Sequence, residues 1–137
     1  MEVISINYLA VLVAALVNMG IGALWYSPLL FGKMWMRMTG ISAENMGKMG
    51  RSVWQAYASS FVGALVMAYV LAHIIDFAEA TTAIAGIAGG FWCWLGFVAT
   101  TSLATVFFER RSWDLYLLNN AYNLVALMAM GALLATW

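Results

Sequence analysis

The chain has 137 residues, of which 65% are hydrophobic and 9% are charged, and its net charge is zero. Globular proteins have roughly 45–50% apolar and about 25% charged residues, so an ordinary soluble domain is excluded. Disordered chains are poor in apolar residues, and nucleic-acid-binding domains carry an excess of basic ones, so those two classes are excluded as well. We predict a single-domain, all-α integral membrane protein.

Four stretches contain no Asp, Glu, Lys or Arg and are long enough to cross a bilayer, which takes roughly 20 residues. The predicted transmembrane helices cover residues 4–26, 52–75, 82–108 and 115–137. A membrane β-barrel would instead alternate polar and apolar residues over ~10-residue segments. We expect the first stretch to be a retained helix, because Glu2 stands where a secretory signal has basic residues.

The basic residues lie in two of the connections between these helices. Four follow the first helix and two follow the third, namely Lys33, Arg37, Lys48, Arg51, Arg110 and Arg111. In a four-helix protein these two connections are on the same side, and cytoplasmic loops carry the excess of Lys and Arg. We therefore expect a multi-pass protein of the bacterial cytoplasmic (inner) membrane, in contact with the lipid bilayer, with both termini on the non-cytoplasmic side.

The first connection, residues 28–51, interleaves apolar residues with Lys33 and Arg37. This pattern is typical of a short helix lying in the membrane interface, with the basic side chains reaching the headgroups. Gly40 is expected to end that helix, and Ser42 to cap a second short turn. A docking or gating surface is the alternative interpretation. Aromatic residues near this side form a predicted interfacial belt of Trp25, Tyr26, Trp35, Trp54, Trp113 and Tyr116.

Each predicted helix also carries uncharged polar residues in its cytoplasmic half. Thr101, Thr105 and Glu109 have the i, i+4, i+8 spacing of one helical face. Because a short loop joins the third and fourth helices, we expect antiparallel neighbours, with Thr105 near Asn119 and Thr101 near Asn123. The predicted polar seam comprises Asn18, Ser59, Thr101, Thr105, Glu109, Asn119 and Asn123. The seam is either a set of interhelical hydrogen bonds that holds the bundle together or a polar cavity.

Other features have weaker implications. His73, Asp76 and Glu79 are spaced so that a helix could present them together to a metal, although solvated loop charges explain them more simply. We expect no cofactor and no metal site. Small residues allow close helix packing in lipid, so the third helix is expected to be the central packing helix or an oligomer interface; its glycines are Gly86, Gly89, Gly90 and Gly96. Trp92 and Trp94 lie deeper than belt aromatics, so they either pack against another helix or another protomer or lie in lipid with an indole N–H to satisfy.

Several runs resemble a family of small bacterial membrane proteins, domain of unknown function 1761. The resemblance rests on Asn7–Val11, on Gly22–Pro28 with its Trp-Tyr-Ser-Pro sequence, and on Phe31–Trp35. It extends through the second half, at Trp94–Phe97, Phe108–Arg111 and Asn119–Asn123, and so covers essentially the whole chain. It implies a four-helix membrane protein and supplies no activity.

Three functional hypotheses remain open. The first is a non-enzymatic structural or accessory protein, acting as a homo-oligomer or as a subunit of a larger membrane complex. The second is a pathway for a small solute or ion, built from the polar seam in an oligomer. The third is an enzyme acting on lipid headgroups through Glu109 and the asparagine cluster. No catalytic motif is present in the sequence, so we expect the protein not to be an enzyme.

Overall fold

The computed structural model describes residues 6–40 and 53–137, and every regular element in these two ranges is helical. In chain order the elements are α1 (Tyr8–Trp25), α2 (Gly32–Thr39), α4 (Val53–Phe77), α5 (Ala83–Cys93), η1 (Trp94–Ala99), α6 (Thr100–Ser102), α7 (Ala104–Phe107) and α8 (Trp113–Thr136). Ile4, Ser42, Lys48, Arg51 and Ser52, which belong to the sequence predictions above, lie outside the described residues.

Within residues 6–40 and 53–137, four helical segments are long and apolar enough to cross a membrane, which confirms the predicted fold class. Polar side chains cap the starts of α1, α5 and α8. The Asn7 carboxamide accepts backbone N–H bonds from Leu9 and Ala10 at 3.1 and 3.2 Å, and so caps α1. Thr82 caps α5, and Ser112 caps α8, which begins at Trp113, two residues before its expected start. The short helix predicted after the first span is α2, and it ends at Gly40, which has a φ of 72°.

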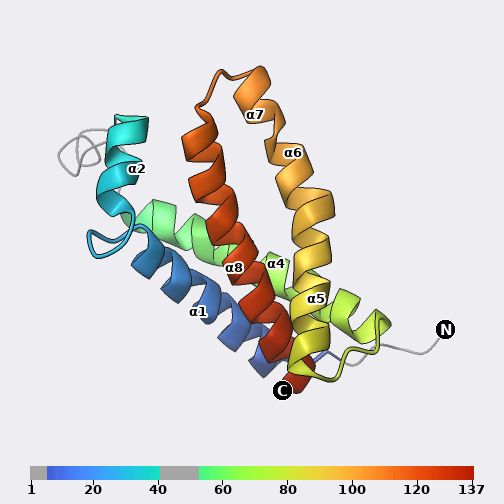
Figure 1. The fold of residues 1–137 in the computed structure, drawn as a ribbon. Helices are drawn as coiled ribbons and strands as arrows, with labels where there is room; N and C mark the ends of the chain where they lie inside the picture. The colour runs from blue at the N-terminus through green and yellow to red at the C-terminus, as the bar shows by residue number, and fades with distance from the viewer. Residues whose placement is uncertain (1–5, 41–52) are drawn as a thin grey trace.

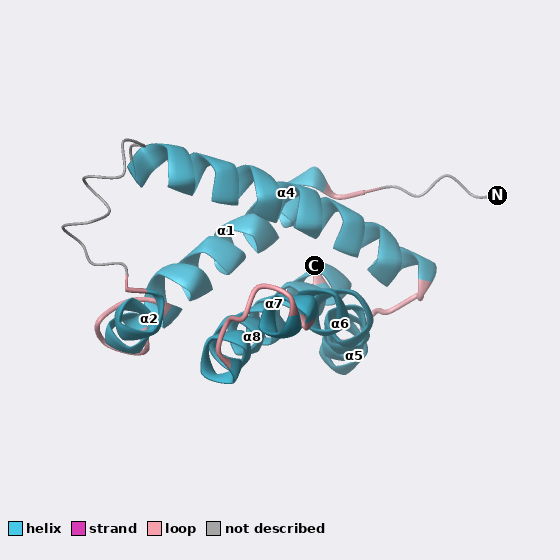
Figure 2. Ribbon diagram, turned by 90° about the horizontal axis from the view of Figure 1, so that it is seen from above, coloured by secondary structure: helices cyan, strands magenta, loops and turns pink. Residues whose placement is uncertain are grey.

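The helices form a crossed pair and a side-by-side pair. Figure 2 shows α1 crossing α4, while α5 and its continuation lie beside α8. The helix α8 packs against α1, α2, α4 and α5, and it is therefore the central helix. The third span, predicted to be either the central packing helix or an oligomer interface, does not hold this position, because one face of α5 contacts α8 while Trp92 is 65% exposed on another. Its role as an oligomer interface stays a prediction. Figure 1 shows α2 and the α7–α8 turn at one end, called the α2 end below, and the C-terminus at the other.

At the C-terminal end, small residues bring the backbones of α5 and α8 into contact. A Cβ atom on Gly86 would clash with the carbonyl oxygen of Gly131, and one on Gly90 would clash with the carbonyl oxygen of Leu127. Only glycine fits at such positions, and this is the close approach by which helices associate in lipid. The surrounding core is aliphatic and alanine-rich, with Ala14, Ala15, Ala68 and Met130 fully buried.

A tight turn joins α1 to α2. The carbonyl oxygen of Ser27 accepts hydrogen bonds from the backbone N–H groups of Leu30 at 3.1 Å and Gly32 at 2.9 Å. A Cβ atom on Gly32 would lie 2.5 Å from the carbonyl oxygen of Tyr26, so this position requires glycine. Pro28, which lacks an N–H donor, stands where α1 has ended. The turn folds α2 back toward the first turns of α8.

Candidate functional site

Amide and phenol groups connect α1 to α8 at the α2 end. The Tyr26 hydroxyl donates to the Asn119 carboxamide oxygen at 2.7 Å. The Tyr122 hydroxyl lies against the Asn18 side-chain oxygen and 3.2 Å from the Asn18 carbonyl oxygen. The two tyrosine rings meet edge to face with their centroids 5.5 Å apart. Asn18 is buried, and its amide nitrogen reaches the Met67 sulfur at 3.8 Å, so this cluster also contacts α4.

A second set of hydrogen bonds, centred on the buried Asn120, connects α8 to the third span. The Asn120 amide nitrogen donates to the Tyr116 carbonyl oxygen at 2.9 Å, and its side-chain oxygen accepts from the Ser102 hydroxyl at 2.9 Å. The Asn120 backbone carbonyl oxygen accepts from the Trp94 indole N–H at 2.9 Å. The Tyr116 hydroxyl in turn donates to the Ala99 carbonyl oxygen at 2.7 Å. Buried polar groups must be hydrogen-bonded, and this arrangement gives both the oxygen and the nitrogen of the Asn120 carboxamide a partner.

The third span is not a uniform α-helix where it meets this set. Residues 94–99 form the π-helical η1, and the helix is interrupted again at Leu103. The hydroxyls of Thr100 and Thr101 each donate to the carbonyl oxygen four residues earlier, inside η1. The Ser102 hydroxyl shares its one proton between two acceptors, because it lies against the Val98 carbonyl oxygen as well as the Asn120 side-chain oxygen. A π-turn has a wider hydrogen-bond register than an α-turn, and Ser and Thr hydroxyls readily bond to such carbonyl groups. Of the three, Ser102 reaches α8, whereas Thr100 and Thr101 are exposed.

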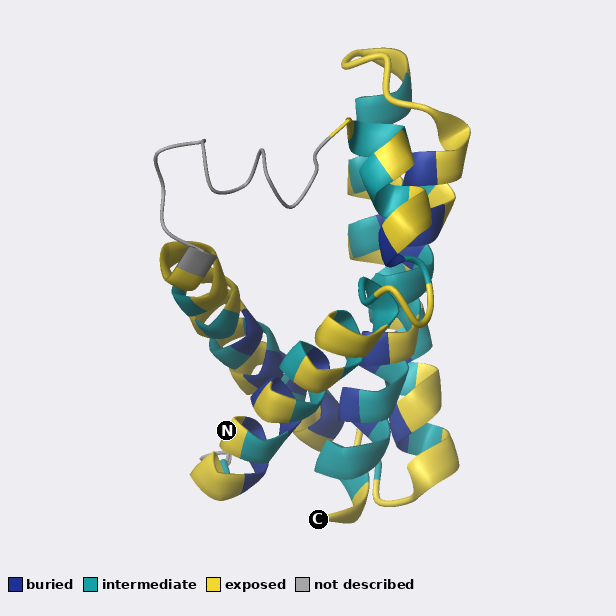
Figure 3. Cartoon of the chain, turned by 90° about the vertical axis from the view of Figure 1, so that its left-hand side faces the viewer, coloured by how far each residue is buried: buried dark blue, intermediate teal, exposed yellow. Residues whose placement is uncertain are grey.

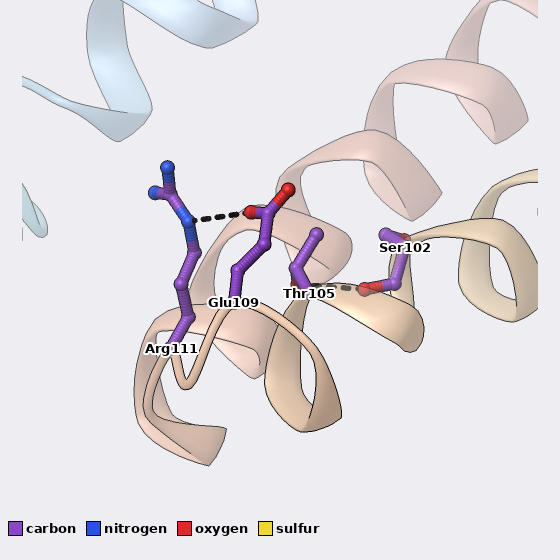
Figure 4. A network of polar contacts seen from close by, with 4 residues as sticks. All are labelled: Ser102, Thr105, Glu109 and Arg111. Atoms are coloured by element: carbon purple, nitrogen blue, oxygen red, sulfur yellow. Dashed lines mark hydrogen bonds and ion pairs between the residues drawn. The ribbon is translucent and has the colours of Figure 1, made fainter.

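A hollow of about 210 Å³ lies between the last part of the third span and α8. Asn123 lines it with a carboxamide that makes no hydrogen bond to any described residue. Figure 4 shows that the Thr105 hydroxyl donates to the Ser102 carbonyl oxygen, at 2.7 Å, and that Arg111 pairs with Glu109 at 3.2 Å. Both members of the ion pair are more than half exposed. The hollow is lined by Ser102, Thr105, Glu109, Arg111, Leu115, Tyr116, Asn119, Asn120 and Asn123.

A second cleft, of about 280 Å³, lies between α1, α4 and α8 on the other side of the Tyr26–Asn119 contact. Gly22 shapes it, because a Cβ atom there would lie 3.0 Å from the Tyr122 hydroxyl. Ser60 lines this cleft, whereas Ser59 does not. The cleft is lined by Met19, Gly22, Ala23, Tyr26, Tyr57, Ser60 and Tyr122.

The structure brings four residues of the predicted seam together around the first hollow: Thr105, Glu109, Asn119 and Asn123. Asn18 is separate and bonds to Tyr122. Thr101 is exposed and bonds to the Phe97 carbonyl oxygen, and the helix is interrupted at Leu103, between Thr101 and Thr105. Ser59 is exposed and bonds to the Ala56 carbonyl oxygen. Thr101 and Ser59 therefore do not line the hollow that the other four share, and the seam as a binding site stays a prediction.

His73, Asp76 and Glu79 lie at the opposite end. The His73 Nδ1 atom lies 2.9 Å from the Tyr69 carbonyl oxygen, and the His73 ring packs against the Tyr69 ring with the centroids 4.6 Å apart. Asp76 and Glu79 are exposed and line a hollow of about 220 Å³ that does not include His73. Within residues 6–40 and 53–137, no three His, Cys, Asp or Glu side chains gather as metal ligands.

Sequence reasoning missed the aromatic members of the site. Trp25, Tyr26 and Tyr116 were assigned to an interfacial belt, yet each donates a hydrogen bond to another helical segment, Trp25 to the Leu118 carbonyl oxygen at 3.2 Å. Trp94 had a detectable signal, since an indole N–H so deep in an apolar span needs an acceptor. Nothing in the spacing distinguished Asn120 from its neighbour Asn119, because the two flank the same helical face.

The fold and these interhelical hydrogen bonds define an integral membrane protein of four long apolar helices, in which polar side chains couple three of the helices around α8. The chain matches, over residues 9–135, the family described as protein of unknown function DUF1761, and it belongs to that family. No curated protein matches the chain. No solved structure matches it either.

Proposed function

We propose that this chain is a non-enzymatic structural or accessory protein of the bacterial inner membrane, working as a homo-oligomer or as a subunit of a larger membrane complex. Both termini would face away from the cytoplasm. The distribution of basic residues supports this orientation, because Lys33 and Arg37 and the pair Arg110 and Arg111 lie at the same α2 end. An alkaline phosphatase fusion after Trp137 should then be active, and a fusion within the α7–α8 turn should be inactive.

The first half of α4 is the observation that carries the proposal. None of residues 54–63 is buried, although Gln55, Ser59 and Ser60 are polar and lie in a helix apolar enough to cross a membrane. From Ala64 onward the same helix packs into the core. Figure 3 shows this change along the helix that follows the grey segment, which begins exposed and becomes buried. Polar and small residues on one helix face favour protein neighbours over lipid.

Cysteine cross-linking in native membranes tests this assignment. In a Cys93→Ala background, Ser59→Cys should give an oxidised adduct, either with a second copy of the chain or with a partner subunit. Phe97→Cys is the matched control, because Phe97 is 70% exposed on a different helix. Equal cross-linking at both positions, or none at Ser59→Cys, would contradict the proposal.

A second candidate function, a small-solute or ion pathway in an oligomer, is favoured by the unbonded Asn123 carboxamide in the 210 Å³ hollow. Polar groups inside a membrane span often mark such pathways. Asn123→Leu and Thr105→Val should then reduce solute flux in liposomes without changing assembly, while Thr101→Val should leave flux unchanged. If the first two variants alter assembly instead, the hollow is part of the structural contact.

A further inference from the structure

A groove of about 730 Å³ separates α2 from the first turns of α8. Volumes of this order are typical of small-molecule sites. Trp25 lines this groove and is held in place by two contacts. Its indole N–H donates to the Leu118 carbonyl oxygen at 3.2 Å, and its ring packs on the Phe31 ring with the centroids 4.8 Å apart. The groove is therefore held by contacts between helices and has a defined apolar floor.

Two opposite charges line this groove. Arg37 lies in the last turn of α2, and Asp114 lies in the first turn of α8. Both side chains are exposed, and no ion pair joins either of them to another described residue. The groove thus presents a cation and an anion at its rim without joining them, and it can satisfy both charges of a single bound group.

The groove is graded from charged to apolar along its length. On the α8 side, Asp114 is followed by Leu117 and Leu118 one turn deeper and by Ala121 another turn deeper. On the other side, Arg37 is followed inward by Met34 and then by Phe31. An amphiphile with a charged head and an apolar tail has this order of chemistry, because its tail leaves water while its head stays in the interface.

We propose that this groove binds a zwitterionic phospholipid of the bilayer that carries a primary amine. Its phosphate pairs with Arg37, its ammonium group pairs with Asp114, and one acyl chain lies against Leu117, Leu118 and Phe31. A phospholipid without the amine would leave Asp114 unpaired beside a phosphate of like charge. The structure therefore assigns to this groove a preference between headgroups, and the assignment does not depend on oligomeric state.

The test uses the full chain in detergent, titrated with dioleoyl phosphatidylethanolamine or dioleoyl phosphatidylglycerol and followed by native mass spectrometry. The wild type should bind phosphatidylethanolamine the more tightly. Arg37→Gln should weaken both lipids roughly tenfold, as expected for the loss of one charge-assisted contact. Asp114→Asn should weaken phosphatidylethanolamine alone. Lys33→Gln is the matched control, since Lys33 is an exposed cation of α2 that does not line the groove.

Equal wild-type affinity for the two lipids would overturn the proposal, and that comparison needs no variant. So would equal effects of Lys33→Gln and Arg37→Gln, which would indicate a general charge effect. Ala121→Phe narrows the apolar end and leaves both charges in place, so it should also weaken phosphatidylethanolamine. If the Arg37 and Asp114 variants instead change the oligomeric state and leave lipid binding unchanged, the groove holds a second copy of the chain and the proposal fails.

Discussion

At the C-terminal end of the bundle the helix backbones touch, whereas at the α2 end side-chain hydrogen bonds link the same helices. Gly86 and Gly90 of α5 meet the backbone of α8 directly. Toward the α2 end, Ser102 and Trp94 reach Asn120, and Tyr26 reaches Asn119. Lipid offers little hydrophobic drive for helix association, so close packing and interhelical hydrogen bonds must supply it. This chain uses both, in different halves.

The two halves should differ in their tolerance to substitution. A backbone contact leaves no room for any added atom, so a single side chain there separates two helices along their length. A hydrogen-bonded pair can lose one member while its neighbours still hold the helices in register. We therefore expect large, all-or-none effects at the glycines and small, graded effects among the amides and phenols.

The largest effect is expected from Gly90→Leu. Even its Cβ atom would fall on the Leu127 carbonyl oxygen, so α5 and α8 must separate. The free energy of unfolding, measured by SDS titration of the protein in mixed micelles, should fall by about 3 kcal/mol or more. Gly20→Ala should not lower it, because no atom outside the nearby backbone of α1 lies within 4 Å of the added methyl group and alanine favours a helix more than glycine does. Similar losses for both variants would refute the backbone-contact account.

A smaller loss of unfolding free energy is expected from Asn120→Ala. This substitution removes the acceptor for Ser102 and the donor to Tyr116, both at 2.9 Å, within a buried site. The same titration should give a loss of about 1.5 kcal/mol. Asn123→Ala is the control, because its carboxamide makes no hydrogen bond to a described residue. Should the Asn123 variant lose as much, Asn120 would have no special role.

Tyr26→Phe should lower the free energy of unfolding by about 0.6 kcal/mol, the average for a hydrogen bond between membrane helices. It removes only the hydroxyl that donates to Asn119 at 2.7 Å and keeps the ring against Tyr122. A double-mutant cycle with Asn119→Ala should show a coupling energy of the same size. Additive losses in that cycle would mean that the two side chains do not interact.

The smallest effect is expected from Thr101→Val, with a change below about 0.5 kcal/mol. The Thr101 hydroxyl is exposed and bonds only within its own segment, at 2.5 Å to Phe97 and 3.2 Å to Val98. Ser102→Ala, one residue further, should cost more, because it removes the bond to Asn120. The reverse order would show that the face assigned to Thr101 is wrong.

The parts of the fold that depend on composition and on helix-ending residues were predictable. Long uncharged runs determined the four apolar helices, and Gly40 marked the end of α2. The small residues of α5 also indicated close packing, although the sequence could not identify α8 as their partner. A glycine pattern specifies a smooth face and carries no information about which helix covers it.

The sequence predicted how deep the residues of the candidate site lie along the helices, but it did not predict which helix faces carry them. Asn119, Asn123 and Thr105 were expected in the same half of the bundle, and they line one hollow. Thr101 was expected on the face of Thr105 by counting at α-helical periodicity, but the helix is interrupted between them at Leu103. No residue type announces such an interruption, so the i, i+4 rule failed without a warning in the sequence. Ser59 failed for a different reason, because the first half of α4 does not pack on the core.

The π-helical η1 gives the third span an uneven sensitivity to its own length. A π-turn accommodates one more residue than an α-turn over nearly the same angle, so removing one residue between Trp94 and Ala99 would let ordinary α-helix form there. Everything beyond that deletion would keep nearly the same angle around the helix axis, and Ser102 would still face Asn120. Deleting Thr101, which lies in α-helix, would instead rotate everything beyond it by about 100° and turn Ser102 away from Asn120. The third span can therefore lose a residue inside η1 at less cost to the site than in the segment that follows it.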